Sequence, residues 1–168
     1  MIAVSEISKT IDDFPGYHVT NHGRFFNSRT GRLMKLSPTN NGDLTVGLMR
    51  NKHQFRFSAK GIVARAFVEG ENEIFNCPML LDCDKENLHV DNIVWRPRWF
   101  AWCYTHQFND IENWYFYGPI VDKATRTEYV NYIEAAVIHG LLCKDIMYSV
   151  YSEDKLVFPT RQKFAYVV

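Results

Sequence analysis

The architecture of this 168-residue chain follows from one stretch near its middle, Phe75-Asn-Cys-Pro-Met-Leu-Leu-Asp-Cys-Asp-Lys-Glu-Asn-Leu-His-Val-Asp-Asn-Ile-Val-Trp95. It begins as an apolar strand, continues as an acidic polar loop, and ends in a short apolar segment that closes on the tryptophan. The loop carboxylates and amides have a plain structural role open to them, because Asp and Asn side chains tie such loops through hydrogen bonds to nearby backbone groups.

The sequence before this stretch predicts small antiparallel hairpins followed by a helix. Residues 14–35 are rich in turn-forming residues between short strand-like runs. Large apolar side chains occur at every second position in residues 44–48 and 55–57, on either side of the polar turn 50–53. This alternation predicts a hairpin with one face in the core. From residue 59 to 67 the apolar spacing becomes helical and leaves basic side chains on the outer face.

The sequence after the stretch predicts a helix and then a separate unit. Residues 96–106 favour a helix with Pro97 in its first turn. The boundary is expected within residues 106–113, which gives an N-terminal domain of residues 1–105 and a C-terminal domain of residues 106–168.

The C-terminal domain is expected to contain a β-hairpin and a pair of helices. Residues 114–122 and 127–130 predict the two strands. Asn131 and Glu134 have the spacing of a capping pair at a helix start, and Gly140 stands where a C-cap is needed before a second helix. Such a pair suits a helix-turn-helix, but the second helix is poor in base-reading side chains, so an ordinary helical pair is the stronger interpretation.

Charge is distributed unevenly along the chain. Its 19 Lys and Arg balance 19 Asp and Glu, so the net charge is zero. Residues 1–65 carry ten basic and four acidic side chains, a balance of +6, and residues 66–168 carry the opposite balance of −6. A basic half favours a nucleic-acid contact, although an acidic half can equally pair with a basic half inside one fold.

Composition indicates a globular protein. With 46% hydrophobic residues the chain can bury one sizeable core or two small ones. No apolar run approaches the roughly 18 residues of a membrane span, and the start lacks the pattern of a signal peptide, so we expect a soluble, unexported chain without membrane contact. The four cysteines form no C-x-x-C pair and are expected to be reduced. A zinc site of Cys77 and Cys83 with His89 or His106 would fit no common ligand spacing.

Three groups of motifs then occur in a characteristic order. The first is Gly16-Tyr17-His-Val19-Thr20-Asn21-His-Gly23-Arg24, with Gly31-Arg32-Leu-Met-Lys35-Leu and Ile62-Val63-Ala64-Arg-Ala66-Phe67 after it. The second is Asp82-Cys-Asp84-Lys85-Glu-Asn87 followed by Asp91-Asn92-Ile-Val-Trp95. The third runs from Ile120-Val-Asp through Tyr132-Ile-Glu134-Ala135-Ala136 to Gly140.

These motifs resemble phage and bacterial HNH homing endonucleases, in which a modular N-terminal domain precedes an HNH core and a helix-turn-helix repeat follows it. The resemblance implies an α+β fold. Its parts would be small antiparallel hairpins with a helix, a ββα-metal-like core, and a C-terminal β-hairpin with a helical pair.

The residues that carry the family's chemistry are largely absent. An HNH nuclease uses a histidine as general base, and an acid or amide beside it with a later Asn or His to hold one divalent ion at the scissile phosphate. The histidine position here is Leu80 and the neighbouring ligand position is Met79, neither of which can accept a proton or bind Mg²⁺. Asn92 is retained. The third position falls within the aromatic segment 99–104.

The sequence therefore predicts a degenerate site with no catalytic residue and no bound metal. Asn92 is its remnant, and His89 and Asp82 are the candidates for a rebuilt site. Mg²⁺ would be a cofactor only if nuclease activity were retained.

Three functions remain open at this point. The first is a catalytically inactive phage protein that binds duplex DNA through seven basic residues: Arg24, Arg32, Lys35, Lys52, Arg56, Lys60 and Arg65. The second is a scaffold for contact with a phage or host protein, such as a virion component or an enzyme modulator, because the former site has become apolar and aromatic. The third is a residual metal-dependent nicking enzyme. The expected location is the host cytoplasm or a virion.

Overall fold

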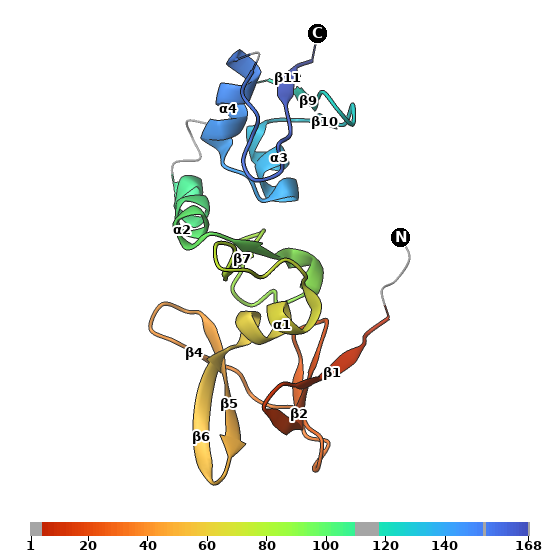
Figure 1. Ribbon diagram of the computed structural model, residues 1–168, viewed down its shortest axis with the longest axis vertical. Coiled ribbons are helices and arrows are strands. Elements are labelled where there is room, and N and C mark those ends of the chain that lie inside the picture. Colours follow the sequence, from red (N-terminus) through yellow and green to blue (C-terminus); the bar gives the residue numbers. More distant parts are fainter. Residues whose placement is uncertain (1–4, 110–117, 153, 168) are drawn as a thin grey trace. The chain divides into compact units, whose positions relative to one another are not determined.

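The structure is a computed structural model that describes residues 5–109, 118–152 and 154–167 (Figure 1). Small antiparallel sheets and helices make up the chain, which confirms the predicted α+β class. Its contacts divide the chain into two compact units, residues 1–98 and residues 99–168, called here the N-terminal and C-terminal units. The helix expected at residues 96–106 lies mostly beyond this division, whereas the prediction had grouped it with the N-terminal domain.

The N-terminal unit is built from three antiparallel sheets around one helix. The first sheet has the order β1-β2-β3, the second β4-β5-β6, and the third is the pair β7-β8. Their bounds are Ser8–Ile11, Phe14–Thr20, Phe25–Asn27, Ser37–Pro38, Leu44–Arg50, His53–Ser58, Cys77–Leu80 and Ile93–Arg96. Helix α1, Ala59–Phe67, contacts strands of all three sheets and lies between the β1–β2 and β5–β6 hairpins (Figure 1).

Helix α1 has the bounds that its apolar spacing predicted. The Ser58 side chain caps its start by accepting the Gly61 N–H at 3.3 Å. Its inner face buries Val63 and Ala64, which join Leu48, Leu80 and the other apolar side chains of one core. This helix therefore links the hairpin modules to the β7-β8 pair.

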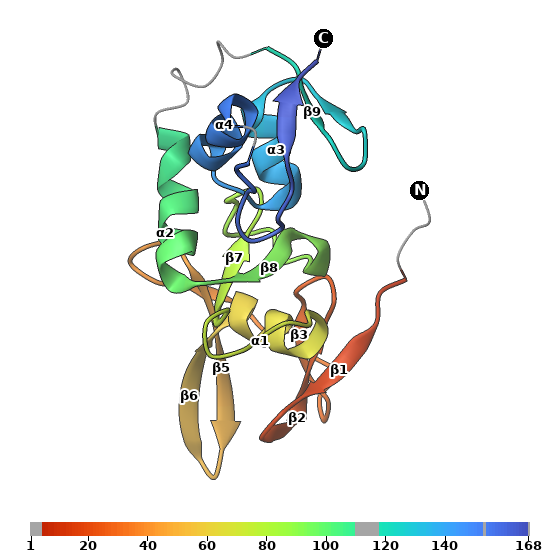
Figure 2. The ribbon, with the colours of Figure 1, turned by 45° about the horizontal axis from the view of Figure 1, so that its top comes forward.

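The β5–β6 hairpin extends away from α1 to its own tip (Figure 2). Asn51 and Lys52 form the two-residue turn, with φ angles of 52° and 65°. Left-handed backbone at both turn positions matches the twist of the two strands, which is why Asn and Gly are the usual residues there. Lysine is an uncommon occupant of such a position.

A close backbone approach fixes the β2–β3 turn against the polar loop. Gly23 has a φ of 76°, and a Cβ built on it would lie 2.3 Å from the Leu88 Cβ. The Val90 N–H donates to the Asn21 carbonyl at 2.8 Å beside this contact. Gly23 of the first motif is thus required by Leu88, which lies between the two parts of the second motif.

The described part of the C-terminal unit packs three helices with a fourth small sheet. The sheet has the order β10-β9-β11, with bounds Glu128–Tyr129, Ile120–Asp122 and Phe164–Tyr166. Helices α2, α3 and α4 span Arg98–Gln107, Tyr132–His139 and Cys143–Tyr151, and α4 packs on β11 (Figure 2). The start of the strand expected at residues 114–122, and residues 110–113 of the expected boundary, lie outside the described residues.

The predicted caps of α3 are confirmed. Asn131 Oδ1 accepts the Glu134 N–H at 3.0 Å, and Glu134 reaches back to the Val130 N–H. Gly140 ends the helix in the left-handed region with a φ of 61°. At the start of α4 the Gln107 Oε1 accepts the Cys143 N–H at 2.8 Å, so a side chain from α2 supplies the cap that α4 lacks.

Candidate functional site

The β7-β8 pair holds apolar residues where the resemblance places a general base. Leu80 pairs with Ile93, and Met79 pairs with Val94. Leu80 is only 6% exposed and belongs to the core of the N-terminal unit, and Met79 is 3% exposed. Because neither side chain has a proton-accepting or metal-binding atom suited to Mg²⁺, this strand provides packing and no acid–base chemistry.

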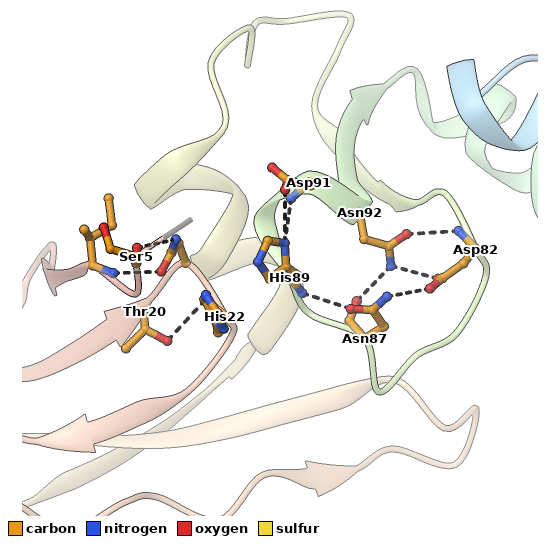
Figure 3. A network of polar contacts seen from close by, with 10 residues as sticks. Ser5, Thr20, His22, Asp82, Asn87, His89, Asp91 and Asn92 are labelled. Carbon is orange, nitrogen blue, oxygen red and sulfur yellow. Dashed lines mark hydrogen bonds and ion pairs between the residues drawn. The ribbon is translucent and has the colours of Figure 1, made fainter. Parts of the chain in front are cut away.

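Asn92 is fully engaged in the loop that follows β7 (Figure 3). Its Nδ2 donates to Asp82 Oδ1 at 2.7 Å and to the Asn87 carbonyl at 2.9 Å, and its Oδ1 accepts the Asp82 N–H at 3.1 Å. Asn87 Nδ2 in turn donates to Asp82 Oδ2 at 2.6 Å. Every polar atom of the Asn92 amide therefore ties the loop, the structural role expected for these residue types.

His89 is directed to the other side of the same loop (Figure 3). Its Nδ1 accepts the Asp91 N–H at 3.3 Å and so caps the short 3₁₀ turn Val90–Asn92. Its ring packs edge-on against the His22 ring, with centroids 4.6 Å apart. Of the two candidates for a rebuilt site, Asp82 lies against the remnant Asn92, whereas His89 caps the 3₁₀ turn.

The third position expected for the site lies on α2, where the polar groups are committed within the C-terminal unit. Tyr104 is buried and its hydroxyl lies 3.5 Å from the Ala136 carbonyl. His106 stacks on Trp102 with centroids 4.1 Å apart. Sequence reasoning missed Gln107, since nothing in the local pattern marks the distant backbone groups of Leu141 and Cys143 that it binds.

Three of the seven predicted DNA contacts have carboxylate partners within the N-terminal unit. Arg24 pairs with Glu6, Lys60 with Asp43 at 2.9 Å, and Arg65 with Glu71 at 3.2 Å. The other four are exposed and form no ion pair with another described residue: Arg32, Lys35, Lys52 and Arg56. Ion pairs between exposed side chains contribute little to stability, so the paired arginines can exchange a carboxylate for a phosphate.

The cysteines show no metal-binding arrangement. Burial raises the pKa of the Cys143 thiol to about 12, and burial together with the nearby Asp82 carboxylate raises the pKa of Cys83. Both shifts disfavour the thiolate that zinc requires. Residues 5–109, 118–152 and 154–167 contain no group of three His, Cys, Asp or Glu side chains placed to hold a metal ion.

A partly buried polar cluster in the C-terminal unit surrounds His139. Its Nε2 lies 2.7 Å from the Tyr129 hydroxyl and 3.4 Å from Gln162 Nε2, which also donates to Asp122 Oδ2 at 2.9 Å. Burial lowers the pKa of His139, and the Asp122 carboxylate opposes that shift. Hydrogen bonds from Gln162, Ala124 and Thr125 lower the pKa of Asp122 despite the opposing effect of burial.

This cluster predicts acid sensitivity of the C-terminal unit. A histidine whose pKa is lowered by folding stabilises the native state above its unfolded pKa of about 6.5, and that stabilisation declines as the pH falls below this value. We expect the urea midpoint of this unit to decrease between pH 7 and pH 5, measured by circular dichroism. In His139→Gln, whose side chain cannot titrate, the urea midpoint should change little between pH 7 and pH 5. An equal decrease in that variant would contradict the assignment to His139.

Comparison with known proteins found one relative in sequence. No family model matches the chain. An uncharacterised HNH endonuclease of Acanthamoeba polyphaga mimivirus is 31% identical over 87 residues, which cover 52% of this chain and 26% of that protein. The chain thus spans about a quarter of the length of this relative.

A solved structure extends the likeness to the fold. The HNH homing endonuclease I-HmuI, in a structure described as showing DNA binding and cleavage, aligns with a TM-score of 0.54 at 20% identity, covering 96% of this chain and 98% of the other. No helix within the described residues is long and apolar enough to cross a membrane. The resemblance seen in the motifs is confirmed, and the chain has the fold of an HNH homing endonuclease-like protein.

Proposed function

We propose that this protein binds duplex DNA through its N-terminal unit and does not cleave it. Similarity to an enzyme that binds and cleaves DNA supports the first part. The second part is supported by Leu80, a core side chain in the position of the general base, and by the hydrogen bonds that hold Asn92 in the loop. A scaffold without base or metal ligand retains only its capacity to bind.

The observation that carries the binding proposal is that four of the seven predicted contacts are exposed and have no carboxylate partner among the described residues: Arg32, Lys35, Lys52 and Arg56. Lysines and arginines that are not neutralised within the fold are available for phosphate groups, whose neutralisation releases counterions and drives association. Arg56 stands opposite Gly47 in the β5–β6 hairpin, and Lys52 stands at its tip. A hairpin of this size can enter a groove of the duplex.

Lys52 supports the proposal in a second way. Its left-handed backbone is a conformation in which glycine would be more stable, by roughly 1 kcal/mol. A charged residue in a strained turn points to a role outside folding.

Replacing Lys52 by glycine separates these two roles. We expect Lys52→Gly to leave the free energy of unfolding unchanged or raise it by up to about 1 kcal/mol, because glycine relieves the turn. Its DNA affinity should fall severalfold and its salt dependence should decrease by about one phosphate contact, measured by gel shift at several ionic strengths. Asn51→Gly is the matched control, since it changes the other left-handed turn residue without changing charge. Equal DNA affinity of both variants would argue against a phosphate contact at Lys52.

A second candidate function is contact with a protein. The aromatic segment proves to be divided, because Phe100 and Tyr104 are buried whereas Trp99 and Trp102 are 59% and 63% exposed. Trp99 stacks on Phe158, which is also exposed. Exposed tryptophans favour protein interfaces. This alternative would be supported if the protein co-purified with a defined partner and Trp102→Ala abolished that co-purification. Recovery of the protein only as a free monomer would oppose it.

A further inference from the structure

A cavity of about 690 Å³ lies in the N-terminal unit, apart from the remnant of the nuclease site. Its walls come from the β1–β2 hairpin, the β5–β6 hairpin and one side of α1. This volume is in the range of protein sites for small molecules, roughly 300–1,000 Å³.

Three phenylalanine rings form the apolar part of the lining. Phe14 packs edge-on against Phe55 and Phe57, with centroids 5.9 and 5.2 Å apart. Phe55 and Phe57 are nearly parallel to each other, at an interplanar angle of 24°. Phe55 is 37% exposed. Because Phe55 does not belong to the core cluster, a planar ring can pack against its exposed part beside Arg50 without displacing the core.

Cations border this aromatic surface. The Arg50 guanidinium lies over Phe14 and Phe55, with its central carbon 5.1 and 5.5 Å from their centroids. Its carboxylate neighbour is Asp13, 4.0 Å away and 81% exposed on its side chain, so this pair leaves most of the guanidinium edge available. Lys9 lines the same cavity, where its ammonium group donates to the Ala66 carbonyl at 2.6 Å.

Acidic groups complete the lining. Asp12 and Asp13 form the turn between β1 and β2. Arg65 also reaches the cavity, but its charge is shared with Glu71. The site thus combines a stacking surface, two available cations and two hydrogen-bond acceptors, which excludes a purely apolar ligand.

We propose that this cavity takes one unpaired nucleotide of a bound nucleic acid, with its base stacked on Phe55 and its phosphate near Arg50 and Lys9. Every base offers a planar face for stacking, and an N–H group on a base, such as the ring N–H of thymine, can donate to the aspartates. The inference rests on the proposed DNA binding, because the same hairpin carries the exposed cations Lys52 and Arg56.

The test uses a ligand too small to depend on the duplex-binding surface. The dinucleotide pdTpdT is titrated into the ¹⁵N-labelled full chain and followed by NMR. We expect shifts of amides in residues 9–14 and 48–57, with binding about tenfold weaker for Phe55→Ala and for Arg50→Gln, because stacking on an aromatic side chain contributes a factor of this order. Phe55→Trp should retain binding.

Met49→Ala is the matched control, because Met49 is an exposed apolar residue of the same hairpin that does not line the cavity. It should bind like the unchanged protein. Absence of shifts at millimolar pdTpdT, shifts confined to the surface around Arg56, or preferential binding of an acidic aromatic peptide would each overturn the proposal. A duplex gel shift on the same samples separates the two ideas. Duplex binding without dinucleotide binding rejects the cavity alone, and dinucleotide binding without duplex binding rejects the proposed duplex function alone.

Discussion

Replacement of Asn92 by alanine is expected to lower the free energy of unfolding of the N-terminal unit by about 3 kcal/mol. The Asn92 amide makes three hydrogen bonds, one of them to the Asp82 carboxylate. Neutral hydrogen bonds contribute about 1 kcal/mol each and those to charged groups about 1.5–3 kcal/mol, while the partners left behind are only partly accessible to water. Urea denaturation, with hydrogen exchange at the Leu81 and Asp82 amides, measures the loss where it should occur.

The matched control is Asn76→Ala, which removes one exposed hydrogen bond to the Glu73 carbonyl. Its effect should stay below about 1 kcal/mol. The comparison also distinguishes a structural asparagine from a catalytic one. A metal ligand held ready for chemistry would leave stability nearly unchanged on removal, so a small effect of Asn92→Ala would contradict the role assigned to it here.

Simultaneous replacement of Arg32, Lys35, Lys52 and Arg56 should abolish most DNA affinity. Each phosphate contact contributes about 0.9 to the slope of log K against log salt concentration. In the quadruple alanine variant of these residues this slope should decrease by up to about four. Its DNA affinity at low ionic strength should fall by at least about 100-fold. Gel-shift titrations at three or more salt concentrations measure both quantities.

The control for that variant changes cations that are already paired. Arg24 and Arg65 each have a carboxylate neighbour in the same unit. Their double alanine variant removes charge together with ion pairs of little stabilising effect, and we expect a smaller decrease in slope. If both sets reduced the slope equally, binding would follow total charge and not the four-residue set.

Local patterns sufficed for much of the fold. The hairpin around residues 50–53, helix α1, and the caps at Asn131 and Gly140 depend on neighbours a few residues away, and all were predicted. Strands β1 and β11 are short and lack a marked alternation of their own. They exist because partner strands elsewhere in the chain supply their hydrogen bonds.

The sequence predicted which chemistry the site lacks, but not which side chains contact one another there. That Leu80 cannot act as a base follows from its identity alone. The separation of His89 from Asn92 depends on which side of the loop each ring or amide faces, which is set by His22 and by Asp82. Likewise, residues 99–104, four of them aromatic, show no polar face, so only packing reveals that Trp99 and Trp102 are the exposed aromatic members.

The central claim is that the scaffold binds DNA without cutting it, and supercoiled plasmid incubated with the protein and Mg²⁺ or Mn²⁺ tests both parts in one gel. The account predicts a salt-sensitive mobility shift before the protein is removed, and plasmid that is still entirely supercoiled afterwards. Accumulation of nicked circles that Asn92→Ala abolishes, or the absence of any shift at low ionic strength, would contradict it.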